Sequence, residues 1–104
     1  MVIFTYDKLA RYIKFNKSSQ IVQDSFDNWY RIIKTENFAN LNEVKNVFNS
    51  VDFVGNDRYV FNIMGNHYRI IAIIHFNIRT VYILWVGTHK EYDKLDAASV
   101  DHKN

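Results

Sequence analysis

The residues best suited to chemistry gather in the second half of the chain. Arg58, Asn62, His67 and Arg69 lie within "RYVFNIMGNHYR", and "THKEYD" follows at residues 88–93. Arginine binds phosphate oxygens through a two-pronged fork, and histidine transfers protons near neutral pH. We expect these side chains to line one carboxylate-free pocket. Such a pocket suits a phosphodiester better than a sugar or a magnesium ion, since both of those call for carboxylates.

The charge distribution agrees with a polyanionic substrate. The whole chain carries a formal charge of +2, but residues 58–90 contain two further cations, Arg79 and Lys90, and no Asp or Glu. Clustered charge of one sign creates a local potential that attracts polyanions. Cations on edge strands also protect sheets against aggregation, so the cluster alone does not establish binding.

RNA cleavage is the reaction that these residue types serve without a metal ion. The substrate's own 2′-OH is the nucleophile, so the enzyme must align it, stabilise charge on phosphorus and protonate the leaving 5′ oxygen. DNA lacks the 2′-OH and would not be cut in this way. No metal or other cofactor is expected. A non-catalytic RNA- or ribosome-binding module and a domain that docks an acidic helix are the alternatives.

Two turns must bring these groups together. A two-residue loop at Gly65 and Asn66 would pair Asn62 with Arg69 across a hairpin, with the cations on one face and apolar residues on the other. The next strand is "VYILWVGTH". A three-residue connection to it sets Arg69 opposite Gly87, and a four-residue connection sets it opposite Thr88. Either register places Arg69 beside "THKEYD".

The first half of the chain is predicted to be mostly helical. Residues 2–6 suit a strand and residues 8–15 a helix. A second helix, capped by Ser18 or Ser19, has one apolar face at the 3.6-residue period, formed by Val22, Phe26, Trp29 and Ile33. A third helix is expected after Asn40. This order, followed by a meander of strands, predicts a single α+β domain over residues 1–104.

The composition excludes several kinds of site and segment and indicates the cellular compartment. The chain has no cysteine, which excludes disulfides and thiolate metal sites. No apolar run approaches the 18 residues of a membrane span, and the N-terminus has no signal-peptide pattern. We therefore expect a cytoplasmic protein.

Two segments carry a family resemblance. "YVFNIMGNHYRIIAIIHF" and "VYILWVGTHKEYDKLDA" together resemble the HigB toxins of bacterial type II toxin–antitoxin pairs, within the RelE-like group. The shared features are a Tyr-Val-Phe-Asn strand, a Gly-Asn turn, an Arg that opens a long aliphatic strand, and a Thr-His-Lys-Glu-Tyr-Asp segment. The resemblance covers residues 51–98, whereas the helical half matches only in layout.

The resemblance implies a RelE-like α+β fold, with N-terminal helices on one face of a small, mainly antiparallel sheet. It also implies an mRNA interferase, an endoribonuclease that cuts mRNA in the 30S A site of the translating ribosome. The implied partner is a HigA-like helix-turn-helix antitoxin. DNA contact would arise only through the antitoxin complex.

These considerations assign roles to individual residues. Arg69 would hold the scissile phosphate, His89 would transfer a proton, and Tyr92 would stack on a base or act as an alternative acid. Lys90 and Arg58 would hold flanking phosphates. The expected catalytic set is Arg69, His89, Tyr92 and Lys90, and the expected RNA-binding set is Arg58, Asn62, His67 and Arg79.

Overall fold

The computed structural model describes residues 1–16 and 19–100, and all structural statements refer to these residues. The elements, in chain order, are β1 (Val2–Phe4), α1 (Tyr6–Phe15), α2 (Gln20–Thr35), α3 (Leu41–Val47), β2 (Asp52–Gly55), β3 (Arg58–Ile63), β4 (Tyr68–His75), η1 (Phe76–Ile78), β5 (Thr80–Thr88), α4 (His89–Tyr92) and η2 (Ala97–Ser99).

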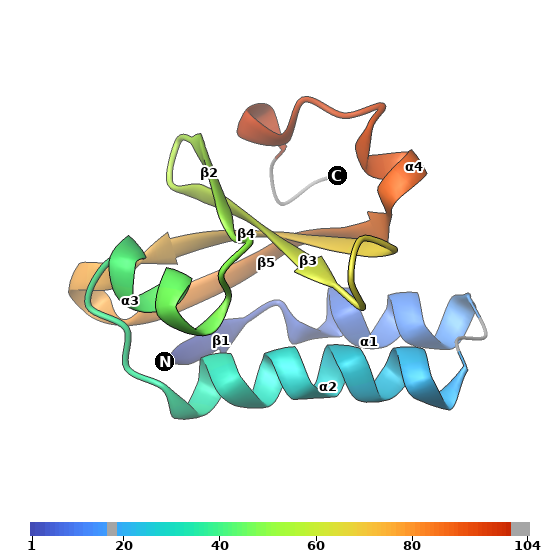
Figure 1. Cartoon of the computed structure of the whole chain (residues 1–104), viewed down its shortest axis with the longest axis horizontal. Helices are drawn as coiled ribbons and strands as arrows, with labels where there is room; N and C mark the ends of the chain where they lie inside the picture. The colour runs from blue at the N-terminus through green and yellow to red at the C-terminus, as the bar shows by residue number, and fades with distance from the viewer. Residues whose placement is uncertain (17–18, 101–104) are drawn as a thin grey trace.

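The strands form one sheet in the order β1-β5-β4-β3-β2 (Figure 1). β1 pairs with β5 in parallel, and the other neighbouring strands pair antiparallel. Helices α1 and α2 lie side by side beneath the sheet, and the chain from α4 to residue 100 crosses the opposite side (Figure 1). The prediction of an α+β fold with helices on one face of a mainly antiparallel sheet is confirmed.

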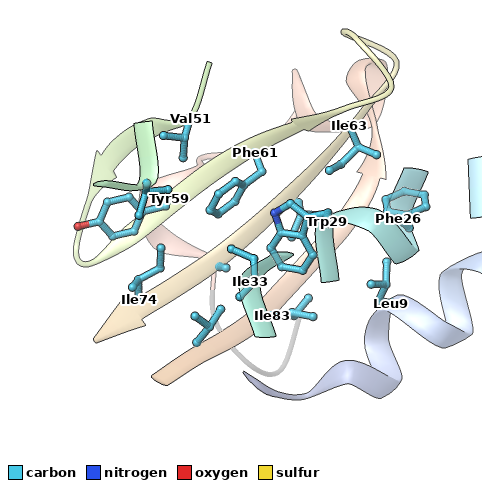
Figure 2. Packing of buried hydrophobic residues seen from close by; sticks show 14 of the residues in the cluster. Leu9, Phe26, Trp29, Ile33, Val51, Tyr59, Phe61, Ile63, Ile74 and Ile83 are labelled. Carbon is cyan, nitrogen blue, oxygen red and sulfur yellow. The ribbon is translucent and has the colours of Figure 1, made fainter. Parts of the chain in front are cut away.

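The helix pair buries the apolar face of the sheet, which we call the helix face. The periodic set predicted for α2 is buried, with Phe26, Trp29 and Ile33 at 1% exposure or less. Figure 2 shows Trp29 and Ile33 of α2 beside Phe61 of β3. Burying each such side chain contributes about 1.5–3 kcal/mol. Ser19 caps α2 by accepting a hydrogen bond from the Val22 N–H, whereas Ser18 lies outside the described residues.

The β3–β4 hairpin has the predicted register. Asn62 pairs with Arg69, and the ladder ends at Ile63 and Tyr68. The loop therefore holds four residues, 64–67, although the expected loop held two. The register is unchanged because the loop is centred on the same point. Positive φ falls on Met64 and Gly65, at 55° and 67°.

The pairing of β4 with β5 contains a β-bulge. The connection between these strands is four residues long, 76–79, yet Arg69 pairs with Gly87, which only a three-residue connection was expected to produce. A connection of residues 76–79 alone would set Arg69 opposite Val86. Pairing shifts by one residue at the bulge, which leaves Leu84 without a partner on β4 and brings Gly87 opposite Arg69. The bulge therefore decides which residue of β5 lies opposite Arg69.

Residues of the N-terminal segment support this bulge. The Thr5 hydroxyl donates to the Ile83 carbonyl at 2.6 Å, and the Lys8 ammonium donates to the Leu84 carbonyl at 3.1 Å. Leu84 and Trp85 both pack in the cluster on the sheet side away from α1 and α2. We call this side the far face. Because two successive residues share it, the side-chain alternation of β5 is inverted beyond the bulge.

The segment after α4 covers part of the far face. Ala97 and Val100 are buried against Val60, Ile71 and Leu84. The remainder of the far face, near the β3–β4 loop and α4, stays accessible. No helix in the described part of the chain is both long and apolar enough to cross a membrane.

Candidate active site

Arg69 is the centre of the site. Its Nη1 lies 2.8 Å from His89 Nδ1, and its Nη2 donates to Asn66 Oδ1 at 2.9 Å. Its guanidinium carbon lies 4.9 Å from the centre of the Tyr92 ring, a cation–π contact. Arginine can only donate, so His89 Nδ1 accepts the first bond and carries no proton.

The second nitrogen of His89 faces a carboxylate. His89 Nε2 lies 3.3 Å from Asp93 Oδ2, four residues later. With Nδ1 accepting from Arg69, the proton of a neutral imidazole sits on Nε2, the ring nitrogen that lies near Asp93. Arg69, His89 and Asp93 therefore form a continuous chain of polar contacts, in which the carboxylate holds the ring and stabilises an imidazolium when one forms.

A short helix holds these two residues in place. The Thr88 hydroxyl accepts from the Glu91 N–H at 3.2 Å, and the Glu91 carboxylate accepts from the Thr88 N–H at 2.8 Å. This reciprocal capping box starts α4. The "THKEYD" segment thus folds as one helical turn, which puts His89 and Asp93 on the same side. The His89 N–H also donates to the His67 carbonyl at 3.0 Å, which fixes α4 against the hairpin loop.

Tyr92 presents a protonated phenol. Burial raises its pKa above the ordinary 10.0, against the opposing effect of Arg69, and Asp52 and Asp93 add to the rise. At neutral pH the hydroxyl is therefore a hydrogen-bond and proton donor. Because Arg69 already lies over its ring, Tyr92 suits the role of an acid better than that of a base-stacking platform.

Two open hollows flank Arg69. The polar hollow, about 320 Å³, is lined by residues 49–52, Val60, Asn62, Arg69 and Tyr92. The hairpin hollow, about 430 Å³, is lined by Met64, residues 66–68 and residues 88–90. Both volumes fall in the range of about 300–1,000 Å³ that is usual for small-ligand sites. The fold thus brings Asn62, His67, Arg69, His89, Lys90 and Tyr92 to one region.

Two of the expected RNA-binding arginines lie elsewhere. Arg58 sits at the opposite end of β3 from Asn62, roughly 13 Å away along the strand. Its Nε donates to the Val100 carbonyl and its Nη1 to the Asn56 carbonyl, both at 2.8 Å. Arg79 lies in the β4–β5 connection, where its Nη1 donates to the Phe76 carbonyl. The expectation that Arg58 converges with the other cations is wrong, because backbone carbonyls hold it at the C-terminal segment.

The expectation of a carboxylate-free pocket is also wrong. Asp93 contacts His89, and Asp52 lines the polar hollow. The acid-free stretch 58–90 is real, but these two carboxylates enter from β2 and from beyond α4. Across the described ranges, no group of three or more His, Asp or Glu side chains is arranged to hold a metal ion.

Sequence reasoning missed three residues of this site. Asp93 follows His89 by four residues, the spacing that places two side chains on the same side of a helix, so the sequence could have indicated this contact. Asn66 lies in the turn, as expected, but its side chain also accepts a hydrogen bond from Arg69, which was not expected. Nothing in the sequence marks Asp52, because β2 is short and its pairing with β3 contains an irregularity.

Comparison with known proteins agrees with this geometry. Residues 22–95 match the HigB toxin family, described as a RelE-like toxic component of a toxin–antitoxin system. The mRNA interferase HigB of Escherichia coli O6:H1 is 35% identical over 68 residues, which is 64% of this chain and 66% of that protein. The mRNA interferase toxin HigB of Escherichia coli K12 is 45% identical over 58 residues, or 54% and 56%. The mRNA interferase HigB of Shigella flexneri has the same values.

These matches span 56% to 66% of the length of those relatives. The family match itself covers well over half of the 104 residues, and it includes every residue of the site just described. The chain therefore belongs to the HigB family of RelE-like toxins.

Proposed function

We propose that the chain is the toxin of a type II toxin–antitoxin pair and cleaves mRNA on the translating ribosome by metal-free attack of the substrate 2′-OH. The observation that carries this proposal is the contact of Arg69 with both His89 and Tyr92 between two open hollows. The similar proteins named mRNA interferase support the substrate class.

Arg69 and His89 share the first step. In the free protein, a guanidinium N–H of Arg69 occupies the lone pair of His89 Nδ1. When the scissile phosphate accepts that N–H, Nδ1 becomes free to take the proton of the 2′-OH. Asp93 stabilises the imidazolium through the Nε2–H. Arg69 meanwhile neutralises the charge that builds on the phosphorane oxygens.

Tyr92 completes the reaction. The 2′-oxygen–phosphorus bond forms, the phosphorus–5′-oxygen bond breaks, and the Tyr92 hydroxyl gives its proton to the leaving 5′ oxygen. The products are a 2′,3′-cyclic phosphate and a 5′-hydroxyl. The His89 imidazolium then releases its proton to solvent and Tyr92 takes one from solvent, which restores both groups. With a pKa above the ordinary 10.0, the phenol carries its proton before the reaction.

The remaining polar residues bind the RNA. His67 and Lys90 line the hairpin hollow, where the exposed Lys90 holds a flanking phosphate. Asn62 lines the polar hollow. Arg58 and Arg79 contribute long-range attraction of the RNA only, because their guanidinium groups already bond backbone carbonyls.

The partners follow from this function. The toxin acts in the cytoplasm on mRNA in the 30S A site, and a HigA-like helix-turn-helix antitoxin holds it inactive. Any contact with operator DNA is made through the antitoxin complex.

Arg69→Ala and His89→Ala, each induced in cells beside the unchanged chain, test the proposal. Loss of the proton-transfer group His89 slows such reactions by about 10²–10⁴-fold, and loss of the charge-stabilising group Arg69 by about 10²–10³-fold. Both variants are therefore expected to abolish growth arrest and new mRNA 5′ ends. Arg79→Ala, which removes an equal charge far from the site, is the matched control and should remain toxic. Full growth arrest by both site variants refutes the assignment. Arrest by the unchanged chain without new 5′ ends identifies a non-catalytic RNA-binding module instead.

A further inference from the structure

Arg69 stands between two hollows of different chemistry. It lines the polar hollow, and its hydrogen-bond partners Asn66 and His89 line the hairpin hollow. A phosphodiester bound to Arg69 therefore has one neighbouring nucleoside on the side of each hollow. The hairpin hollow carries His67 and Lys90 and no carboxylate, which suits the sugar–phosphate backbone.

The polar hollow carries a carboxylate. Asp52 pairs with Val60 across β2 and β3, and both residues line this hollow together with Arg69. Asp52 also raises the pKa of Tyr92, so the two groups lie within electrostatic reach. An ionised carboxylate only accepts hydrogen bonds, and it repels a phosphate. The occupant must therefore be a neutral group with hydrogen-bond donors, a ribose hydroxyl or a base. Of these, a base can present two N–H donors side by side to the two carboxylate oxygens.

Guanine fits this chemistry best. Its Watson–Crick edge presents N1–H and N2–H side by side, which match the two oxygens of one carboxylate. Adenine, cytosine and uracil each place an acceptor next to their donor, and that acceptor would face a carboxylate oxygen. The O6 acceptor of guanine, beside N1–H, can take a hydrogen bond from the Asn62 amide or the Ser50 hydroxyl, which line the same hollow.

We propose that the polar hollow is the subsite for a guanine base, and that the Asp52 carboxylate recognises its N1–H and N2–H groups. The proposal rests on the function proposed above and adds a base preference to it. Asp52 is exposed and makes no chemical step, so it is a specificity residue.

The reaction geometry also gives the position of this guanine. The 2′-OH must reach His89, which lines the hairpin hollow, and the leaving 5′ oxygen must reach Tyr92, which lines the polar hollow. The base in the polar hollow is therefore that of the nucleoside immediately 3′ of the cut. Newly formed 5′ ends should begin with guanosine.

The test compares the unchanged chain with Asp52→Asn and with Asp24→Asn. Asp24 is an exposed residue of α2, on the helix side of the sheet, so its replacement changes the net charge equally but leaves the hollow intact. Each protein is induced in cells and the new mRNA 5′ ends are mapped. The unchanged chain and Asp24→Asn are expected to favour guanosine at the first position about tenfold, which corresponds to about 1.4 kcal/mol.

Asp52→Asn should lose that preference and gain cuts before adenosine or cytidine. The new amide presents one donor and one acceptor, which complement the donor–acceptor edges of those two bases. Equal base frequencies for the unchanged chain, or the same guanosine preference in Asp52→Asn, overturn the proposal while leaving the nuclease assignment intact.

A binding experiment distinguishes failure of the guanine subsite from failure of the nuclease assignment. Purified protein is titrated with short RNAs that carry one 2′-deoxynucleotide 5′ of the test base, which prevents attack at that phosphate. The proposal expects about tenfold tighter binding of the guanosine RNA than of the uridine RNA, and loss of this ratio in Asp52→Asn. Absence of cleavage in cells together with this binding ratio refutes the nuclease and keeps the guanine subsite. Equal binding of the two RNAs refutes the subsite.

Discussion

Replacing Gly87 with alanine should disturb the candidate active site, because it displaces the Trp85 ring that packs beside Tyr92. A methyl group at this position would lie 2.4 Å from Cη2 and 2.5 Å from Cζ2 of Trp85, and 3.1 Å from the Glu91 carboxylate. Carbon atoms in contact are ordinarily about 3.5–4.0 Å apart, so the indole must move by about 1 Å. Its neighbour is Tyr92, with ring centres 6.2 Å apart, and Tyr92 in turn contacts Arg69.

Overpacking of this kind costs about 1–3 kcal/mol. In a domain of this size, each kcal/mol lowers the melting temperature by about 4–8 °C. We expect Gly87→Ala to melt at least about 4 °C below the unchanged chain and to cleave RNA more slowly. Gly55→Ala is the control: Gly55 also resists substitution, because its φ is 97°, but a methyl group there meets nothing within 4 Å, and Gly55 pairs with Arg58 at the end of β3 away from the site. It should lose stability without losing activity per folded molecule.

Thermal unfolding of Gly87→Ala, Trp85→Phe and the double variant tests the contact directly. Phenylalanine lacks the two colliding carbons, so the double variant should be more stable than the sum of the single effects predicts. Strictly additive melting shifts, or a Gly87→Ala protein as stable and as toxic as the unchanged chain, would refute the packing of Trp85 over Gly87.

Three further predictions concern the surroundings of the site. Asp93→Asn should slow cleavage about tenfold or more while leaving the melting temperature unchanged, because Asp93 is exposed and acts by orienting His89; an unchanged cleavage rate would contradict this role. Arg58→Ala should lower the free energy of unfolding by about 1–3 kcal/mol, since it removes a charged donor from the Val100 carbonyl. Its activity per folded molecule should fall no further than that of Arg79→Ala, which loses the same charge; chemical denaturation paired with a cleavage assay checks both. Burial chiefly, with Glu91 and Tyr68, raises the pKa of Tyr12 from 10.0 to about 12. The folded state therefore favours the protonated phenol, and its stability should decline from pH 10 to about 12; Tyr12→Phe should flatten that decline in alkaline denaturation.

Much of the fold could be predicted because the core follows simple periods. The four apolar residues of α2 recur on one helical face, and all four are buried. The Asn62–Arg69 pairing depends only on where the loop is centred. The predicted pairing is therefore correct, although the loop holds four residues and not two. These features depend on local spacing, which a sequence displays directly.

The parts that could not be predicted depend on contacts between distant segments. The bulge at Leu84 is supported by Thr5 and Lys8, about 80 residues earlier in the chain, and no local pattern on β5 announces it. Arg58 is of a type suited to phosphate, but its guanidinium donates to the carbonyls of Val100, in the C-terminal segment, and of Asn56, in the β2–β3 turn. The approach of Arg69 to His89 and Tyr92 could be predicted all the same, because either expected register of the last two strands places Arg69 beside residues 88–93.

Cleavage of an mRNA with a single altered sugar tests the central claim most directly. The cut is first mapped in a reconstituted translation reaction, and the nucleotide 5′ of the cut is then replaced by its 2′-deoxy form. If Arg69 and His89 direct the 2′-OH onto the phosphate, the altered mRNA stays intact at that bond while still being translated. Cleavage of the same bond at an unchanged rate would show that the 2′-OH is not the nucleophile, and would contradict the account.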